Sequence, residues 1–312
     1  MNLPSSHRHT CVDTYDLALQ AAQIACAGHD YPRGALYVAA TPIGNLADIT
    51  LRALHLLQIA DVICCEDTRH TQSLLQAYGI TQPRHLAVHQ HNEAESATTV
   101  CGLLRQNQRV VYVCDAGTPA ISDPGARLVA HVRQAGCPVV PLPGVCSITA
   151  ALSVAGISHD DQGDFVFMGF LPTRAGARAA TIKAIQSELR TVVLLEAPHR
   201  IEALAQTLQA LGERMLTIGR ELTKQFENIV TVKAHDFVAW LSHDSNRLRG
   251  EFVLVLHPAP CPVTLELDLH TLKLLMAELP LKTAVKLAAD ITGAPRNALY
   301  DAALRLAHSA TS

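Results

Sequence analysis

Short apolar runs rich in β-branched residues recur between residues 35 and 256, and most are separated by stretches with the periodicity of an amphipathic helix. Runs of this length and composition predict strands. They lie at 35–40, 60–65, 86–89, 109–114, 137–142, 164–170, 191–197, 215–222, 228–233 and 250–256. Strands that alternate with helices predict an α/β protein whose first half holds a largely parallel sheet. The runs after 215 follow one another more closely, which favours antiparallel neighbours and a mixed second sheet.

Two of the intervening segments carry signals for helix ends. The helix expected over 48–60 has Asp48 as its N-cap. The helix expected over 123–136 has Pro124 near its start and Gly136 at its end, which is the usual punctuation.

The same pattern divides the chain into four parts. A polar stretch at 155–164 predicts a seam between two α/β domains, and after 257–262 the pattern becomes wholly helical. Residues before 34 have no clear place in the alternation, so we expect a loosely attached extension with one helix over 15–27. The predicted parts are an extension (1–33), an N-terminal α/β domain (34–156), a second α/β domain (157–260) and a helical tail (261–312).

Composition narrows the class of protein. Half of the residues are apolar but only 4% are aromatic, which favours helices packed on sheets. No apolar run approaches the roughly 20 residues that span a bilayer, and the N-terminus lacks the features of a secretory signal. The nine cysteines include no C-x-x-C pair. We therefore expect a cytoplasmic protein in a reducing compartment, without a membrane partner.

Charge and histidine content raise two further questions. Sixteen histidines and the segment "HQHNE" at 89–93 suggest a metal site. No second cluster of possible ligands has the spacing of a zinc site, so we expect a polar loop and no metal. The net charge is −3, which counts mildly against RNA as a substrate. Any contact with RNA must then come from local basic patches.

Three strand ends are followed by unusual loops, at 41–50, 115–125 and 141–152. Each alone is explained by a tight turn. Together, at the carboxyl edge of one sheet, they predict a ligand site, where Gly117 and Gly144 let the backbone approach the ligand and Asp115 accepts hydrogen bonds. None matches the G-x-G-x-x-G or P-loop patterns. A nucleotide-like ligand without a pyrophosphate fits best, which points towards S-adenosylmethionine without fixing it.

Ten sequence motifs occur along the chain in an order that is typical of one protein family. They are "TPIGNLADITLRAL", "CEDTRHTQSLL", "HNE", "DAGTPAISDPG", "PLPGVCSITAAL", "GFLP", "EAPHR", "GRELTKQFE", "RGEFVLV" and "LPLKTAVKLAADITGAPRNALYDAAL". From Gly34 to Leu306 the chain closely resembles the bacterial ribosomal RNA small subunit methyltransferase I family. The resemblance implies two α/β domains of the tetrapyrrole-methylase type, a helical C-terminal extension and a homodimer. It also implies S-adenosylmethionine as methyl donor and, as target, a cytidine ribose 2′-hydroxyl in the decoding region of 16S rRNA, on the small ribosomal subunit.

The resemblance also assigns residues to the donor site. It implies contacts from Pro42, Asp115, Ala116, Gly117, Thr118, Ile121, Cys146, Ser147, Glu196 and Leu222. The chain departs from the family at Ala197, where the family has Ser, and residues 1–33 have no counterpart in it.

Methylation of a ribose hydroxyl requires help from a base or a cation, because the hydroxyl is a poor nucleophile at neutral pH. The candidates in strand-end motifs are Glu66, Arg69, Glu93 and Arg200, with Glu66 and Glu93 preferred as the base. The alternative for each of these charged residues is a position in a helix cap or a solvated loop. Asp67 or Thr68 is expected to cap the helix that follows.

RNA contacts are expected from basic side chains beside the site. The candidates are Arg174, Arg178 and Lys183 in the segment 171–183, and Lys224. In the helical tail, Lys282, Lys286 and Arg296 suit either RNA contact or packing. Two rival functions stay open: methylation of a tetrapyrrole on the same fold, and binding of RNA or ribosomes without catalysis.

Overall fold

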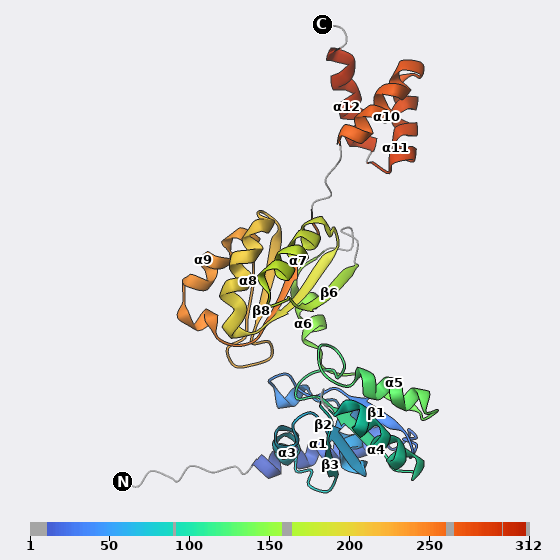
Figure 1. Cartoon of the computed structure of the whole chain (residues 1–312), viewed down its shortest axis with the longest axis vertical. Coiled ribbons are helices and arrows are strands. Elements are labelled where there is room, and N and C mark those ends of the chain that lie inside the picture. The colour runs from blue at the N-terminus through green and yellow to red at the C-terminus, as the bar shows by residue number, and fades with distance from the viewer. Residues whose placement is uncertain (1–10, 90–91, 158–163, 260–264, 295, 310–312) are drawn as a thin grey trace. The chain divides into compact units, whose positions relative to one another are not determined.

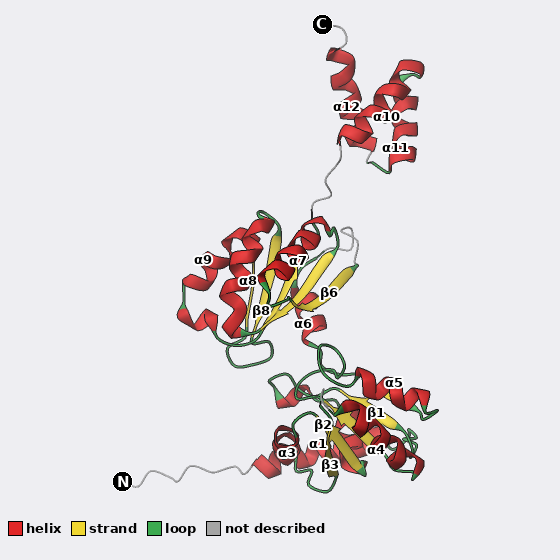
Figure 2. Cartoon of the chain, viewed as in Figure 1, coloured by secondary structure: helices red, strands yellow, loops and turns green. Residues whose placement is uncertain are grey.

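The computed structural model describes residues 11–89, 92–157, 164–259, 265–294 and 296–309. The chain divides into two compact units, residues 1–259 and 260–312. The first unit contains two five-stranded sheets with helices packed on them, and the second is helical (Figures 1 and 2). Among the helices in the described ranges, none is long and apolar enough to cross a membrane.

The first sheet is parallel throughout, as the alternation of strands and helices predicted. Its strand order is β3-β2-β4-β1-β5, and every neighbouring pair is parallel. The elements are α1 (Cys11–Cys26), β1 (Leu36–Ala39), α2 (Leu51–Ile59), β2 (Val62–Cys65), α3 (Thr68–Ala77), β3 (Arg84–Ala87), α4 (Glu93–Arg105), β4 (Val110–Val113), α5 (Ala126–Gln134) and β5 (Val139–Leu142).

Helices cover both faces of this sheet because alternate strand residues point to opposite sides. Ile63 and Val111 pack with α1, α2 and α3 on one face. Val62 and Tyr112 pack with α4 and α5 on the other. Both faces are therefore apolar, and binding surface remains only at the strand ends.

The helix expected over 15–27 is present as α1, but it is not loosely attached. Ala22 and Cys26 are buried in the core beneath α2, and the ring of Tyr15 meets that of Tyr78 edge-on at 5.0 Å. The expectation of a loose extension is therefore wrong for this helix, whose apolar face completes one layer of the first sheet. Residues 1–10 lie outside the described residues.

The cap expected at Asp48 is also wrong. A short 3₁₀ helix, Leu46–Asp48, precedes α2, so the true helix begins two residues later. Thr50 is its N-cap, and its Oγ1 accepts a hydrogen bond of 3.1 Å from the Ala53 amide. Asp67 caps α3 as predicted, since its carboxylate accepts from the Arg69 amide.

The second sheet is mixed, as the closer strand spacing predicted. Its order is β6-β7-β10-β8-β9, in which β6 and β7 are parallel and the other neighbours are antiparallel. The elements are α6 (Ser147–Val154), β6 (Phe165–Phe170), α7 (Ala175–Ser187), β7 (Thr191–Glu196), α8 (Ile201–Leu208), β8 (Met215–Arg220), β9 (Asn228–Lys233), α9 (Phe237–Ser242) and β10 (Phe252–Leu256). Most of the predicted seam, 158–163, lies outside the described residues.

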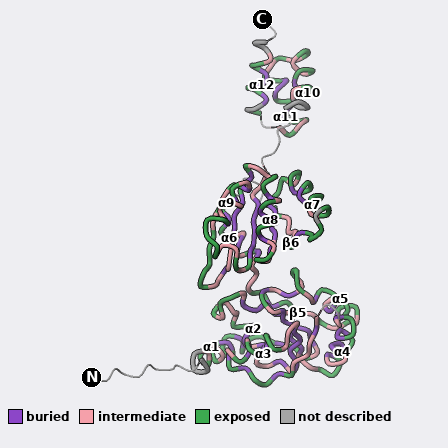
Figure 3. Tube along the Cα trace, turned by 60° about the vertical axis from the view of Figure 1, so that its left-hand side comes forward, coloured by how far each residue is buried: buried purple, intermediate pink, exposed green. Residues whose placement is uncertain are grey.

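The two faces of the second sheet have different partners. Leu194 and Leu254 pack with α7, α8 and α9. Val193 and Val253, one residue away in each strand, pack with α6. Buried residues accordingly follow the strands and the inward faces of the helices (Figure 3). Because α6 directly follows β5 of the first sheet, it joins the two sheets through apolar contact.

The second unit is the predicted helical tail. It consists of α10 (Leu265–Glu278), α11 (Leu281–Thr292) and α12 (Arg296–Ser309). Leu272, Ala288 and Leu299 meet in a core of its own. The left-handed residue Gly293 ends α11.

Candidate active site

The three unusual loops follow three neighbouring strands, β4, β1 and β5, and hydrogen bonds join them. Thr41 and Gly117 exchange two backbone hydrogen bonds of 2.9 Å, which link the first loop to the second. The Thr118 Oγ1 donates to the Val145 carbonyl at 2.9 Å, which links the second loop to the third. The prediction that the loops meet at one edge of the sheet is therefore confirmed.

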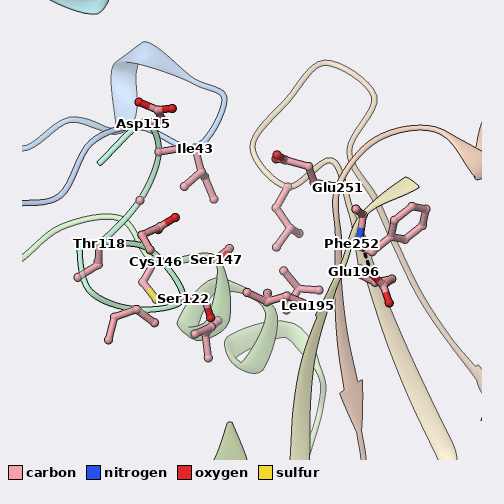
Figure 4. A pocket seen from close by; sticks show the side chains of 18 of the residues that line it. Ile43, Asp115, Thr118, Ser122, Cys146, Ser147, Leu195, Glu196, Glu251 and Phe252 are labelled. Carbon is pink, nitrogen blue, oxygen red and sulfur yellow. Dashed lines mark hydrogen bonds between the residues drawn. The ribbon is translucent and has the colours of Figure 1, made fainter. Parts of the chain in front are cut away.

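A cavity of about 370 Å³ lies between these loops and the second sheet. In Figure 4, Asp115, Thr118 and Cys146 come from the loops, and Glu251 and Phe252 stand on the opposite side. Nine of the ten residues that sequence assigned to the donor site line it: Asp115, Ala116, Gly117, Thr118, Ile121, Cys146, Ser147, Glu196 and Leu222. Pro42 is not among the lining residues, and its neighbour Ile43 takes that place.

Several lining residues were missed from the sequence. Ser122 and Asp123 belong to the loop "DAGTPAISDPG", in which Gly117 and Thr118 are the stronger sequence signals for a ligand site. Leu195 and Val253 line the cavity because strand alternation turns them away from α7, α8 and α9. Glu251 precedes β10 and gave no signal of its own.

Strained backbone is concentrated in two loops of the site. In the described ranges, five non-glycine residues have positive φ, and four of them are Ala120 (66°), Ser122 (66°), Glu221 (52°) and Thr223 (67°). The loops that carry them supply lining residues from each side of the cavity. Such conformations cost about 1–3 kcal/mol each and persist where the surroundings hold them, most often at functional sites.

Carboxylates give the cavity a negative wall. Glu66 follows β2, and Asp115 and Asp123 follow the neighbouring strand β4. Burial raises the pKa of Glu66, and the charges of Asp115 and Asp123 raise it further. Burial likewise raises the pKa of Asp123, to which Asp115 and Glu251 also contribute. The cavity therefore disfavours further negative charge and favours a cation.

Lys224 balances part of this charge. Its Nζ donates to Glu221 at 2.8 Å and to Glu251 at 3.0 Å. Burial alone would lower the pKa of Lys224, but these two hydrogen bonds raise it overall. Its alkyl stem lies against Gly44, where an added Cβ would be 2.3 Å from the Lys224 Cγ. The lysine that sequence assigned to RNA is thus part of the cavity wall.

The four catalytic candidates have different surroundings. Glu66 lines the cavity. Glu93 is only 6% exposed, and its Oε1 accepts from the amides of Gly125 (3.0 Å) and Leu128 (2.9 Å), so it caps α5 from a distance in sequence. It lies outside the cavity lining. These two bonds give Glu93 a structural role as a cap of α5.

The two arginines among the candidates are already engaged. The Arg69 side chain is 89% exposed and pairs with Asp67 at 3.2 Å. The Arg200 Nε lies 3.1 Å from the Glu196 carboxylate, and its guanidinium also donates to the Leu171 carbonyl. Arg200 therefore holds Glu196, which is 2% exposed, at the edge of the cavity.

The basic segment expected to contact RNA forms the start of α7. Arg174 is its N-cap, Arg174 and Lys183 are exposed, and Arg178 is half-buried. None of the three lines the cavity. They offer positive charge outside it.

In the histidine-rich segment, a hydrogen bond joins the described residues His89 and Asn92. The Asn92 Oδ1 accepts from the His89 amide at 2.8 Å, while Gln90 and His91 lie outside the described residues. Within the ranges that the structure describes, no group of three or more His, Cys, Asp or Glu side chains is arranged to hold a metal ion.

The sequence of the chain matches known methyltransferase families. Residues 35–237 match the family model for tetrapyrrole (corrin/porphyrin) methylases, and residues 265–307 match the RsmI C-terminal HTH domain. Over 279 residues, 88% of this chain, it is 47% identical to ribosomal RNA small subunit methyltransferase I of Escherichia coli O157:H7, 96% of which is covered. The namesake of Neisseria meningitidis serogroup B is 48% identical over 87% of this chain and 93% of its own.

Solved structures share the fold at lower identity. The X-ray structure of the cobalamin biosynthetic enzyme cobalt precorrin-4 methyltransferase superposes with a TM-score of 0.53 at 20% identity, covering 73% of this chain and 98% of its own. A uroporphyrin-III C-methyltransferase from Thermus thermophilus, complexed with S-adenosylhomocysteine, gives 0.50 at 21% identity over 72% and 96%. These likenesses establish the two-sheet fold of the first unit.

Proposed function

The chain belongs to the tetrapyrrole (corrin/porphyrin) methylases and, within them, to the ribosomal RNA small subunit methyltransferase I family, and from this membership we propose its reaction. It transfers a methyl group from S-adenosylmethionine to the ribose 2′-hydroxyl of a cytidine in the decoding region of 16S rRNA. The substrate is the assembled small subunit, because there the decoding region has its final shape. The protein acts as a homodimer in the cytoplasm.

The observation that carries the proposal is the acidic cavity beneath the three joined loops. S-adenosylmethionine supplies an activated methyl group on a positively charged sulfonium. The carboxylates of Glu66, Asp115 and Asp123 suit that charge, because burial and mutual repulsion raise the pKa of Glu66 and of Asp123 and a nearby cation would relieve this repulsion. A volume of about 370 Å³ falls in the range of single small-molecule sites.

The remaining walls suit the other parts of such a donor. Ile43 and Leu195 offer apolar contact, and Asp115 is an acceptor for hydroxyl or amino groups. The helix α6 begins at the cavity, and its N-cap Cys146 makes no side-chain capping bond, so first-turn amides are free of a side-chain cap. Those amides favour a carboxylate.

Basic side chains outside the cavity support an RNA substrate despite the net charge of −3. Arg174 is the N-cap of α7 and Arg178 lies one turn into the helix, where both suit a phosphate backbone, and Lys183 lies further along the same helix. The tail that matches an HTH domain offers a second candidate surface. The net charge of −3 is a property of the whole chain, whereas RNA recognition needs only these local basic patches.

The test is methyl transfer from labelled S-adenosylmethionine to small ribosomal subunits that lack the modification. Naked 16S rRNA and a precorrin-type tetrapyrrole are assayed in parallel, and the labelled nucleoside is identified by mass spectrometry. We expect 2′-O-methylcytidine on the subunit, with loss of labelling in Asp115→Asn. Label on the tetrapyrrole would support the rival enzyme instead. No label on any acceptor, together with no binding of S-adenosylhomocysteine, would leave only a binding function.

A further inference from the structure

A second hollow of about 410 Å³ adjoins the donor cavity. Its wall includes Glu93, Ser122, Asp123, Gly125 and Arg127. Ser122 and Asp123 also line the donor cavity, so the loop 122–123 separates the two spaces and faces both. Among the site residues predicted from sequence, only Glu93 lines this hollow.

We propose that the second hollow receives the acceptor nucleotide and that Asp123 takes the proton of its ribose hydroxyl. The inference rests on the function proposed above and adds to it the place of the acceptor and the identity of the base. It follows from the position of Asp123, which is the ionisable residue common to the two linings.

The size of the donor cavity requires a separate place for the acceptor. At about 370 Å³ it lies near the lower end of the range for sites that hold one small molecule. A donor and a nucleotide together need more room. Transfer also needs the two reacting atoms within about 3–3.5 Å of each other, so the acceptor must enter where the two spaces meet.

The other carboxylates are less suited to the role of base. Glu66 lines the donor cavity and not the second hollow. Glu93 lines the hollow, but two backbone amides already occupy its Oε1. Asp123 is exposed at the boundary, and its raised pKa brings it closer to the neutral range where a general base works best.

The proton and the electrons balance in this scheme. The ribose oxygen forms a bond to the methyl carbon as the bond between that carbon and sulfur breaks, and the bonding pair stays on sulfur, which becomes neutral. The hydroxyl proton passes to the Asp123 carboxylate. Water then removes it, and no oxidant, reductant or metal is required.

Tyr112 packs behind the wall of the hollow. It is fully buried and lines neither the hollow nor the donor cavity. Its ring lies against Gly125, where an added Cβ would be 2.3 Å from the Tyr112 Cε1. Tyr112 therefore supports the part of the wall that Gly125 forms.

Arg127 supplies the charge that a nucleotide requires. It is exposed in the first turn of α5 and lines the hollow. Its guanidinium is suited to a phosphate oxygen of the acceptor strand. Arg133 lies on the same helix, exposed in the last turn and outside both linings, and therefore provides a matched control.

The experiment compares Asp123→Asn, Arg127→Gln and Arg133→Gln with the natural protein. Three quantities are measured: the single-turnover rate on unmethylated small subunits between pH 5.5 and 8.5, the Kd for those subunits, and the Kd for S-adenosylhomocysteine. Thermal unfolding checks that each variant folds.

We expect Asp123→Asn to lower the rate about 10²- to 10⁴-fold and to abolish its rise with pH, while both Kd values stay within about twofold. Arg127→Gln should lower the slope of log Kd against log salt by about 0.7–0.9, and Arg133→Gln should not.

Two outcomes would overturn the inference. They are an Asp123→Asn enzyme with the natural rate and pH profile, and equal salt slopes for the two arginine variants. Failure of the natural protein itself to methylate subunits would instead contradict the function proposed above. The subunit-binding measurements stay informative even if Asp123→Asn does not fold, since the two arginine variants do not depend on it.

Discussion

The Thr118 hydroxyl donates to the Val145 carbonyl across 2.9 Å and thereby joins the loop after β4 to the loop after β5. The two residues are separated by 27 positions in sequence and lie beside one cavity. The backbones of Thr41 and Gly117 are also hydrogen-bonded to each other. The loops after β1, β4 and β5 are therefore joined into one rim of the cavity. Removal of the Thr118 hydrogen bond should therefore affect ligand binding as well as stability.

We expect Thr118→Val to lower the free energy of unfolding by about 1 kcal/mol and to weaken S-adenosylhomocysteine binding several-fold, because the Val145 carbonyl loses its donor. Calorimetric titration and denaturant unfolding measure the two effects. Thr181→Val is the control, since the Thr181 hydroxyl bonds only to the Ala177 carbonyl within α7. Equal ligand affinities for the two variants would contradict the role given to Thr118.

Gly125→Ala should destabilise the protein by about 2 kcal/mol or more. Its φ is +124°, and the new Cβ would lie 2.3 Å from the Tyr112 ring, which is fully buried and cannot move away. Gly102→Ala is the matched substitution: it lies inside α4 with nothing within 4 Å, so it should stabilise by about 0.5–1 kcal/mol. Urea unfolding distinguishes the two, and changes of the same sign would refute the argument.

Glu93 should prove to be a cap. Glu93→Ala leaves two buried amides, those of Gly125 and Leu128, without an acceptor and should cost about 2–4 kcal/mol of unfolding free energy. Glu93→Gln keeps an acceptor oxygen and should cost about 1 kcal/mol or less. A general base would give a different result: Glu93→Gln would lower the single-turnover rate about 10²-fold with stability unchanged.

Glu66 should make the donor-free protein less stable as the pH rises. Because its folded pKa is raised, the folded state holds a proton that the unfolded state has lost between the two pKa values, so stability falls through that window. Glu66→Gln should therefore stabilise the donor-free protein at pH 7.5 by roughly a few tenths of a kcal/mol, given its partial exposure, with less gain at pH 4.5. Glu95→Gln, on the exposed side of α4, is the control. A constant gain across this pH range would contradict the sign.

The start of α7 should contribute to RNA binding through charge alone. Replacing Arg174, Arg178 and Lys183 by Gln should lower the slope of log Kd against log salt for small subunits by about 2. S-adenosylhomocysteine affinity should stay unchanged because none of the three lines the cavity. The same replacement at Arg84, Arg105 and Arg133, which are exposed elsewhere, is the control. Equal slopes for both triple variants would exclude α7 as an RNA contact.

The periodicity of the chain predicted most of the fold. The ten strands, the parallel first sheet and the mixed second sheet follow from local patterns, since apolar runs and turn residues lie close together in sequence. Asp48 shows the limit of local signals: it is a good N-cap residue, but the 3₁₀ turn that contains it moves the cap to Thr50. The packing of α1 was not predictable either, because its partners lie in α2 and α3.

Site residues could be predicted from the sequence where a local loop motif contains them. They were missed where their position in the site depends on contacts with residues far away in sequence. Gly117 and Thr118 stand out in any strand-end loop. Glu251 does not, because its place depends on the order of strands in the second sheet. Glu93 looked catalytic beside Asn92, and only the amides of Gly125 and Leu128, more than 30 positions away, reveal its structural role.

The strand order of the second sheet has a consequence for synthesis on the ribosome. Its central strand, β10, is the last to be made, and it separates the pair β6–β7 from the pair β8–β9. Until residue 256 leaves the exit tunnel, each pair presents an unpaired inner edge, which is the kind of edge that aggregates or recruits chaperones. Folding of this half therefore waits for its final strand, and the nascent chain must keep a gap open for it.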